Sequence, residues 1–266
     1  MHGLLKGVAK LRQINVQSLG FIPTIADSAK SGGTYSQAQP ARAVLRLEQL
    51  HRHPSMRDFL RNGGELYIAT EYVTVDTFSL LYDAGHRHFA EKFVIPTSAR
   101  FGPLMAQWKD LRLSCYGHLQ TNKVRKALQL FHSIETISSE SIALLVRQHL
   151  DVLGSASHVD QLLIQVNQGR EPQKSGVWPE NAQRLIDHCR DLALPIEGLM
   201  TIPPRGQDPL PYFRSLRALA DSNGLHHCQM GMTDDWPQAV RCGATRVRIG
   251  RGIFGPKADD NGIVEG

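Results

Sequence analysis

Cysteine is scarce in this chain of 266 residues, and no two of its four cysteines form a Cys-x-x-Cys pair. The sequence therefore predicts neither a disulfide framework nor a structural zinc site, and it suits a reducing, cytoplasmic compartment. No apolar run approaches the roughly 18 to 20 residues that cross a bilayer, so no membrane association is expected. The N-terminal stretch MHGLLKGVAKLRQ also lacks the apolar core of a secretory signal.

A concentrated basic region is missing as well. The formal net charge is +5, and the lysines and arginines are spread along the chain. This mild charge suits a small anionic ligand as well as nucleic acid. Histidines are numerous, but no carboxylates are seen to converge on them, so no metal site is predicted. The sequence also has no Gly-x-Ser-x-Gly elbow, Walker loop or His-Glu-x-x-His motif.

Hydrophobic residues make up 41% of the chain, which is enough for a large buried core. Residues 23–40, PTIADSAKSGGTYSQAQP, show no apolar period, and we predict that residues 1–40 form a flexible or loosely packed arm. From residue 41 onward, Val44, Leu47 and Leu50 recur at helical spacing. We therefore expect a single domain over residues 41–266 that begins with a helix.

After the break at Asn62-Gly63-Gly64, strand-like and helix-like segments alternate. The first of these helices is predicted to be capped by Asp76, and a later one by Ser138 or Ser139. Because parallel strands need connections of helix length, the alternation predicts a parallel sheet. Eight such units favour a closed (β/α)8 barrel over an open doubly wound sheet. The eight predicted strands are residues 65–70, 88–91, 111–116, 133–137, 162–167, 197–200, 226–230 and 245–249.

Binding groups of such a barrel gather where its strands end. The seventh and eighth strands end in MGMT and RIGRG, and glycines let a ligand approach the backbone closely. Thr233 could hold a phosphate at the start of the next helix, or it could form only a capping turn. Gly250, Gly252 and Gly255 spell G-x-G-x-x-G, but the chain that follows is too short for the second strand of a dinucleotide-binding unit.

Arg248 is the most informative charged residue of the last strand. Side chains alternate along a strand, so Arg246 and Arg248 share one face, and Val247 and Ile249 share the other. The apolar pair should face the helices, which turns Arg248 toward the barrel mouth. A buried arginine needs an acceptor, either a bound anion or the carboxylate of a structural ion pair. The acids considered for such a pair are Glu71, Glu91 and Glu197.

Six groups of residues, in order between about residues 65 and 255, resemble the signatures of the pyridoxal-phosphate homeostasis proteins. Their sequences are AGHRHFAE (84–91), GHLQTNK (117–123), IQVN with KSG (164–167 and 174–176), GLMTIP (198–203), MGMTDD (230–235) and VRIGRGIFG (247–255). The resemblance implies a single barrel similar to the N-terminal domain of alanine racemase, with pyridoxal phosphate as its cofactor. It also implies a cofactor carrier or regulator without substrate turnover. We expect no second, β-rich domain of the kind that racemases carry, which argues against an amino-acid racemase.

The resemblance also implies where the cofactor would lie. A phosphate cup would form from Met232, Thr233, Gly250 and the residue that follows it, and Arg248 would face the pyridine nitrogen. An arginine at that place keeps the ring nitrogen unprotonated. The binding candidates on the quoted motifs and strand ends are Lys92, Asn122, Lys123, Lys174, Met200, Gly231, Met232, Thr233, Arg248, Gly250 and Arg251.

The chain departs from the family pattern at the cofactor site. Alignment places Glu71 where the family keeps the lysine that forms a Schiff base with the cofactor, and a carboxylate cannot form an imine. An asparagine that follows the second strand is replaced by Lys92. Ser114 replaces a histidine of the family pattern, and Arg251 replaces the threonine of the last phosphate loop.

Two explanations of these departures stay open. The protein has exchanged covalent pyridoxal phosphate for another anion, or for no ligand. Alternatively it binds pyridoxal phosphate without an imine, or through a relocated lysine at position 92, 123 or 174. With Arg251 at the cup and Glu71 deeper in, the pocket would suit a ligand with one anionic and one cationic end. A Glu71–Arg248 ion pair that fills the vacated pocket is the structural alternative.

Three functions follow from the sequence. The first is a non-enzymatic protein that binds a phosphorylated small molecule at the barrel mouth, with no nucleic acid or membrane as partner. The second is an enzyme that acts on an amine or amino acid, with Glu71 as general base and a nearby lysine as acid. The third is an interaction protein that binds a protein partner through the arm of residues 1–40.

Overall fold

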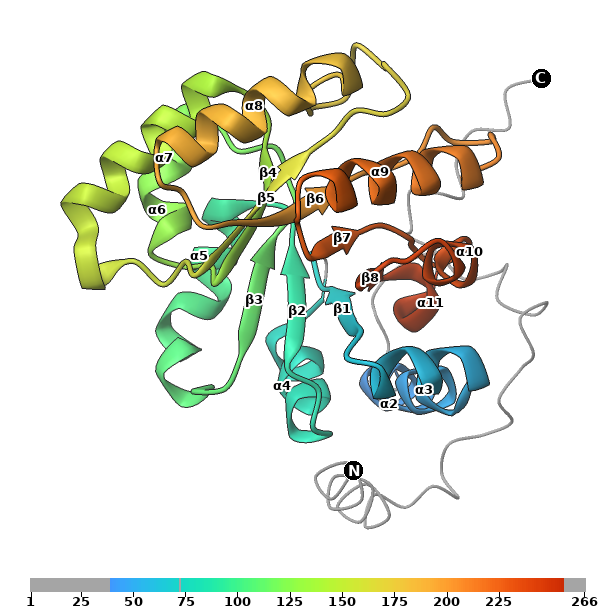
Figure 1. Cartoon of the computed structure of the whole chain (residues 1–266). Helices are drawn as coiled ribbons and strands as arrows, with labels where there is room; N and C mark the ends of the chain where they lie inside the picture. Colours follow the sequence, from blue (N-terminus) through green and yellow to red (C-terminus); the bar gives the residue numbers. More distant parts are fainter. Residues whose placement is uncertain (1–38, 72, 256–266) are drawn as a thin grey trace, which may run out of the picture.

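The computed structural model describes residues 39–71 and 73–255, which form a closed barrel of eight parallel strands. Each strand pairs with the next along the chain, and the eighth pairs with the first (Figure 1). The predicted (β/α)8 barrel is therefore confirmed, and the open doubly wound sheet is excluded. The strands are β1 (Glu65–Ala69), β2 (His88–Glu91), β3 (Arg112–Cys115), β4 (Ser133–Ile137), β5 (Gln161–Gln165), β6 (Ile196–Met200), β7 (His227–Gln229) and β8 (Arg246–Ile249).

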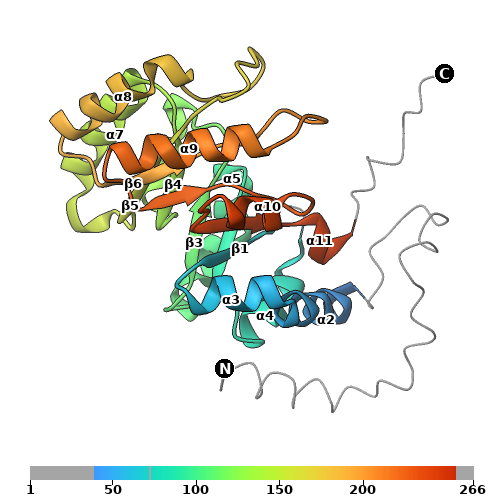
Figure 2. The ribbon, with the colours of Figure 1, turned by 45° about the vertical axis from the view of Figure 1, so that its right-hand side comes forward.

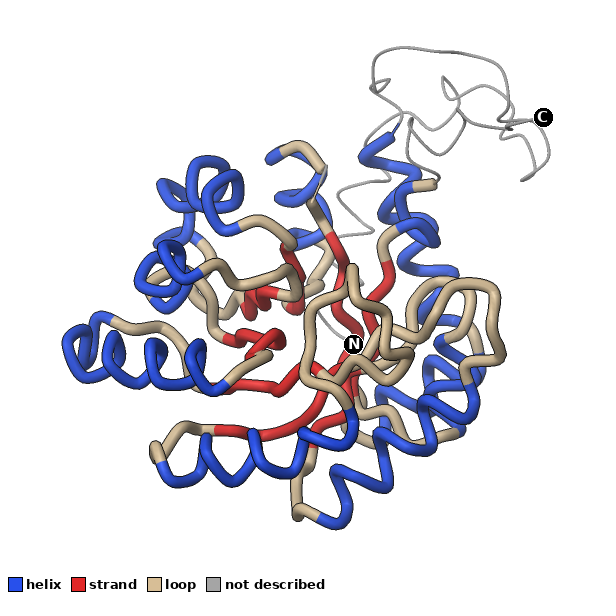
Figure 3. The backbone as a smooth tube through the Cα atoms, turned by 90° about the horizontal axis from the view of Figure 1, so that it is seen from above, coloured by secondary structure: helices blue, strands red, loops and turns tan. Residues whose placement is uncertain are grey.

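Helices surround this barrel, which Figure 3 shows from above as a ring of strands within a ring of helices. Within residues 39–71 and 73–255, two helices precede β1, at least one helix follows each strand, and three short 3-10 segments complete the connections. The helices are α2 (Gln39–Arg52), α3 (Pro54–Arg61), α4 (Val75–Asp83), α5 (Val94–Phe101), α6 (Val124–Leu128), α7 (Glu140–Leu153), α8 (Pro179–Asp191), α9 (Leu210–Ser222), α10 (Trp236–Arg241) and α11 (Arg251–Phe254). The 3-10 segments are η2 (Gly102–Gln107), η3 (Thr121–Lys123) and η4 (Gly154–Ala156).

The helix starts were predicted with mixed success. Ser139 caps α7 as expected, because its side chain accepts a hydrogen bond from the backbone N–H of Ile142. The predicted cap of α4 at Asp76 is wrong. Thr74 caps this helix instead, and Asp76 lies within its first turn, where an acidic side chain favours the helix dipole. The helix start expected within residues 233–237 lies at Trp236, the first residue of α10, with Asp235 at the N-cap position.

The leading helix predicted from residue 41 exists as α2, which packs against α4 and α11 (Figure 2). Val44 and Leu47 are buried there, as their spacing indicates. The flexible arm predicted for residues 1–40 lies almost wholly outside the described residues, and so does the partner surface expected on it. The domain boundary at residue 41 stays a prediction. No helix of the described residues is long and apolar enough to cross a membrane.

The barrel interior is polar, and its outer face is apolar. Arg246 on β8 donates hydrogen bonds to Glu65 on β1 (2.7 Å) and Gln161 on β5 (2.6 Å), so these side chains meet inside the barrel. The alternate residues of β8, Val247 and Ile249, are buried in the hydrophobic core outside it. The sequence argument about the two faces of β8 is thereby confirmed.

Arg246 closes the N-terminal end of the barrel, which we call the floor. Its side chain is 0% exposed. Besides its bonds to Glu65 and Gln161, the guanidinium lies 3.1 Å from the Nε2 atom of His227 and 5.6 Å from the centre of the Tyr67 ring. A buried charge is tolerated here because neighbouring strands supply its acceptors.

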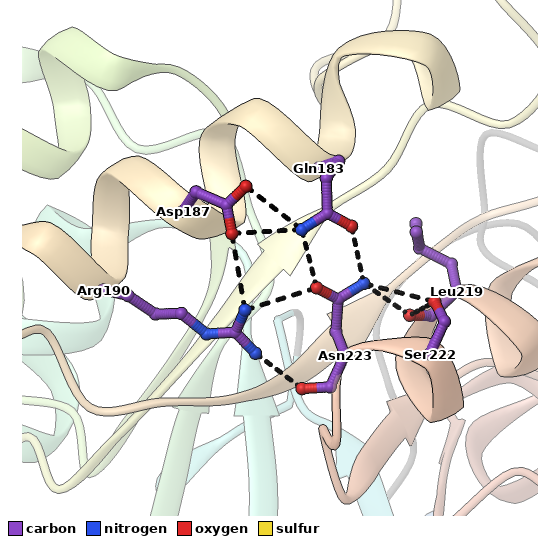
Figure 4. A network of polar contacts seen from close by, with 6 residues as sticks. All are labelled: Gln183, Asp187, Arg190, Leu219, Ser222 and Asn223. Carbon is purple, nitrogen blue, oxygen red and sulfur yellow. Dashed lines mark hydrogen bonds and ion pairs between the residues drawn. The ribbon is translucent and has the colours of Figure 1, made fainter.

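A separate polar network joins the outer helices α8 and α9 (Figure 4). The amides of Gln183 and Asn223 exchange two hydrogen bonds, of 2.8 and 2.9 Å. Arg190 donates to the backbone oxygen of Asn223 (2.5 Å) and also contacts Asp187. These contacts fasten the end of α9 to α8 on the outside of the barrel, so they serve the scaffold.

Candidate functional site

A cavity of about 740 Å3 opens at the C-terminal ends of the strands. Its wall comes from the ends of β1 and β8 and from the segments that follow β1, β3, β5, β6, β7 and β8, and this is the end where barrels carry their binding sites. The sequence-predicted candidates that line it are Glu71, Lys174, Met232, Thr233, Arg248, Gly250 and Arg251. Other lining residues include Ala69, Val73, Tyr116, Arg205, Gln207, Asp234 and Asp235.

Arg248 forms part of the cavity wall and is ion-paired with a buried acid. Its guanidinium donates to Glu135 on β4 (2.6 Å), and the side chains are 4% and 0% exposed. Ser114 on β3 donates to the other oxygen of Glu135 (2.5 Å). The ion pair predicted as one alternative for Arg248 exists, but none of the three acids considered for it was Glu135. The polar alternation of β4 was the signal that could have identified this acid.

Glu71 and Tyr116 lie together on the β1 and β3 side of the cavity. Burial raises the pKa of the Tyr116 hydroxyl, and so does its hydrogen bond with Glu71, while Arg248 opposes the shift. The hydroxyl therefore stays protonated and donates to the Glu71 carboxylate. The Arg248 guanidinium lies over the same ring, 4.0 Å from its centre. One tyrosine thus bridges the acidic and the basic side chain of the wall.

The backbone that carries Glu71 is held by Arg100 on α5. The Arg100 guanidinium donates to the carbonyl oxygens of Thr70 (3.3 Å), Glu71 (3.3 Å) and Val73 (2.9 Å). It also forms an ion pair of 2.7 Å with Glu91. The segment after β1 is therefore fixed through its main chain, from outside the barrel.

Glu91 completes this arrangement, which we call the Arg100 clamp. Its carboxylate accepts hydrogen bonds from Thr70 (2.6 Å) and Thr97 (3.2 Å). Burial raises the pKa of Glu91, although Arg100 and these hydroxyls oppose the shift. Arg100 lies in a segment without any motif, so sequence reasoning had no signal for it.

The segments after β7 and β8 converge on the opposite side of the cavity. The hydroxyl of Thr233 accepts a hydrogen bond from the backbone N–H of Gly252 (3.0 Å), and Arg251 is ion-paired with Asp234. A Cβ atom at Gly250 would lie 3.2 Å from that of Ala69, at the end of β1. A hydroxyl, a guanidinium and glycine backbone therefore meet here. This donor set fits a phosphate group.

The lysines differ sharply in position. Lys174 lines the cavity, donates to the carbonyl oxygen of Pro203 (3.3 Å) and is ion-paired with Glu171. Lys92 is exposed, with its Nζ atom 5.3 Å from the centre of the Phe93 ring. Lys123 lies with Asn122 in η3. Among the described residues, the cavity lining includes Lys174 but neither Lys92 nor Lys123 nor Asn122.

Met200 and Gly231 also stand apart from the lining. Met200 is fully buried at the end of β6. Gly231 has a φ of +92°, and a Cβ there would lie 2.5 Å from that of Ala239, so glycine is required by the turn itself. Its carbonyl accepts from the backbone N–H of Arg248 (3.0 Å). Across the described residues, no group of three or more histidines, cysteines or acids could hold a metal ion.

Fold and site together define a class: a (β/α)8 barrel with a polar interior and a cavity at the C-terminal strand ends. Alanine racemase of Clostridium difficile shares this fold, with a TM-score of 0.62, 13% identity and coverage of 84% of this chain and 59% of that one. At this identity the likeness concerns the fold alone.

The chain belongs to the pyridoxal phosphate homeostasis protein family. A member from Aquifex aeolicus is 33% identical over 208 residues, covering 74% of this chain and 88% of the relative. A member from Haemophilus influenzae is 32% identical over 208 residues, with coverage of 74% and 86%. PipY of Synechococcus elongatus, solved with PLP bound, has a TM-score of 0.69 and 29% identity, and covers 80% of this chain and 100% of that one. No family model matches the sequence.

Proposed function

We propose that this protein binds a phosphorylated small molecule of the pyridoxal phosphate type without a covalent bond, at the barrel mouth, and does not turn it over. Family membership supports the ligand class, and so does the relative PipY, which was solved with PLP bound. The observation that carries the proposal is the pairing of two features in one cavity. The segments around Thr233 and Gly250 offer phosphate donors, and Glu71, which the sequence alignment assigns to the position of the family's lysine, lines the same cavity.

The phosphate end of such a ligand fits the residues present. Thr233 would donate its hydroxyl to the phosphate, and the glycine backbone of the segment after β8 would approach it closely. Arg251 would add positive charge, shared with Asp234. Arg248 would hold the ring end, with its orientation fixed by Glu135 and Tyr116.

The aldehyde end does not fit a covalent attachment at position 71. Pyridoxal phosphate supplies an aldehyde that condenses with amines, and a carboxylate offers no amine. Lys174 is the specific alternative, because its Nζ atom belongs to a side chain that lines the cavity. Its Nζ atom is ion-paired with Glu171, so capture of the aldehyde there would require this pair to open.

The test is a titration of the full chain with pyridoxal phosphate, followed by borohydride reduction and peptide mass spectrometry. We expect saturable binding in calorimetry and no reduced adduct on any lysine. Thr233→Val should weaken binding about tenfold, which corresponds to about 1.4 kcal/mol. Ser222→Ala, which removes an exposed hydroxyl at the far end of α9, should leave the affinity unchanged.

Three outcomes would contradict the proposal. A reduced adduct that disappears in Lys174→Arg would replace non-covalent binding by capture at Lys174. Absence of binding to pyridoxal phosphate and to inorganic phosphate alike would remove the phosphate site altogether. Turnover of an amine substrate that is lost in Glu71→Gln would favour the enzymatic alternative.

A further inference from the structure

The cationic side chains of the cavity wall differ in whether they already have a partner. Among the described residues, four cations and three acids line the cavity: Lys174, Arg205, Arg248 and Arg251, with Glu71, Asp234 and Asp235. Three of the four cations form ion pairs, which are Lys174–Glu171, Arg248–Glu135 and Arg251–Asp234. Their positive charge is therefore shared with a carboxylate before a ligand enters.

The acids of the wall matter for a phosphate ligand. Together with Glu135 and Glu171, which lie outside the lining, the wall and its ion-pair partners hold five carboxylates and four cations. A phosphate monoester brings close to two further negative charges at pH 7. A phosphate site in this wall therefore needs a cation whose charge is not already compensated by a neighbouring carboxylate.

Arg205 is such a cation. Its side chain is exposed at the cavity, and it forms neither an ion pair nor a hydrogen bond with any residue in the ranges 39–71 and 73–255. A guanidinium carries five N–H donors in a planar fork that matches two oxygens of a phosphate. Arg205 therefore offers its whole charge and its donors to a ligand.

The loop after β6, which carries Arg205, is fixed at its stem. The hydroxyl of Thr201 donates to the carbonyl oxygen of the first residue after β5 (2.9 Å), and Lys174 donates to that of Pro203 (3.3 Å). Arg205 lies at the turn that follows, where Gly206 has a φ of +77°, a conformation that favours glycine. The backbone of Arg205 is thus held beside the cavity, while its side chain has no contact that would keep it from a ligand.

This loop leaves the barrel next to the segment that carries Thr233. The strands β6 and β7 are neighbours, and the backbone N–H of Thr201 donates to the carbonyl oxygen of Gln229 at the end of β7 (3.2 Å). The helices that follow the two strands, α9 and α10, are in contact and lie side by side in Figures 1 and 2. Arg205 and Thr233 line the same cavity from these adjacent segments.

We propose that Arg205 is a specificity-determining residue of this site: its guanidinium binds the phosphate of the ligand from the loop after β6 and supplies the charge that the paired cations do not. This inference rests on the proposed function and names the residue that makes the site selective for phosphate. The preferred ligands are doubly charged phosphate monoesters, and the corresponding alcohols gain nothing from Arg205.

The test compares pyridoxal phosphate with pyridoxal, which has the same ring and no phosphate, by calorimetry of the full chain at pH 7. Arg205→Gln should weaken binding of pyridoxal phosphate about tenfold and leave that of pyridoxal unchanged. Arg205→Lys keeps the charge and loses the planar fork, so its affinity should lie between the two. Higher ionic strength should narrow the difference between the unaltered chain and Arg205→Gln, because it screens the charge of the guanidinium.

Arg214→Gln is the matched control. Arg214 is an exposed arginine on α9, the helix that follows the same loop, and it is not part of the cavity lining. This variant changes the net charge of the chain by the same amount as Arg205→Gln, and it should keep the affinity of the unaltered chain. A thermal melt of each variant establishes that it is folded.

The outcomes separate this inference from the proposed function. Equal affinity of Arg205→Gln and the unaltered chain for pyridoxal phosphate would overturn the role of Arg205 and leave phosphate binding intact. A loss that is independent of ionic strength, or equally large for pyridoxal, would assign Arg205 to the ring or to the loop and also overturn the inference. Failure of the unaltered chain to bind pyridoxal phosphate would overturn the proposed function and the inference together.

Discussion

Arg246 and Arg248 lie two positions apart on the same face of β8, yet they belong to different regions of the barrel. Both are buried and both are ion-paired. Arg246 closes the floor, where Glu65, Gln161 and His227 surround it. Arg248 borders the cavity. Burial and ion pairing alone therefore do not distinguish a candidate binding residue from a structural one. The two arginines are distinguished by whether the side chain lines the cavity.

The largest loss of stability is expected for the ion pair that is most completely buried, Arg248–Glu135. Glu135 is 0% exposed, so Glu135→Gln leaves the Arg248 guanidinium without a counter-charge in the barrel interior. We expect the free energy of unfolding to fall by about 3 kcal/mol, measured by urea denaturation. The double variant Glu135→Gln/Arg248→Met should recover part of this loss. A loss below about 1 kcal/mol would mean that cavity water satisfies Arg248.

A smaller loss of stability is expected when the ion pair on the floor of the barrel is broken. Arg246→Met leaves Glu65 without its cation, but the Glu65 side chain is 27% exposed and can reach water. We expect a loss of about 2 kcal/mol in the free energy of unfolding and an unchanged affinity for pyridoxal phosphate. Weaker ligand binding by this variant would break the separation between floor and cavity, because it would couple the two regions.

The floor should also respond to acid. Burial, and next the neighbouring Arg246, lower the pKa of His227 from 6.5 to about 4. Between these values the unfolded chain binds the proton and the folded chain does not, so stability is constant above pH 6.5 and falls as the pH drops toward 4. Because the ring is partly exposed, we expect this group to contribute about 1 kcal/mol of that loss.

This contribution is measured as a difference between two stability curves. Urea denaturation of the unaltered chain and of His227→Gln from pH 7 to pH 4 isolates the histidine from the carboxylates that titrate in both proteins. The curves should converge toward low pH. Parallel curves would show that His227 takes its proton equally well in the folded barrel.

Much of the fold follows from local patterns. Alternation along β8 predicted the inward face of Arg246 and Arg248, and strand-helix alternation predicted eight parallel strands. The partner of Arg248 did not follow, because Glu135 lies 113 positions away in sequence and only the barrel closure brings the two together. The start of α4 was misplaced because Thr74 and Asp76 are both good capping residues, and the backbone conformation decides between them.

In the candidate site, too, some residues could be predicted from the sequence and others could not. Glu71, Thr233, Gly250 and Lys174 were found from their place after strands and from family signatures, and all line one cavity. Lys92 was selected by the same rule, but it does not line the cavity, because the chain turns directly into α5 after this residue. Tyr116 was not selected, since an aromatic residue at a strand end looks like core.

The Arg100 clamp has a consequence for how this site can change over generations. It grips carbonyl oxygens, which every amino acid possesses, so the frame around position 71 does not depend on the side chain mounted there. The side chain at position 71 can therefore change from an amine to an acid, or back, while the contacts of Arg100 with the backbone are kept.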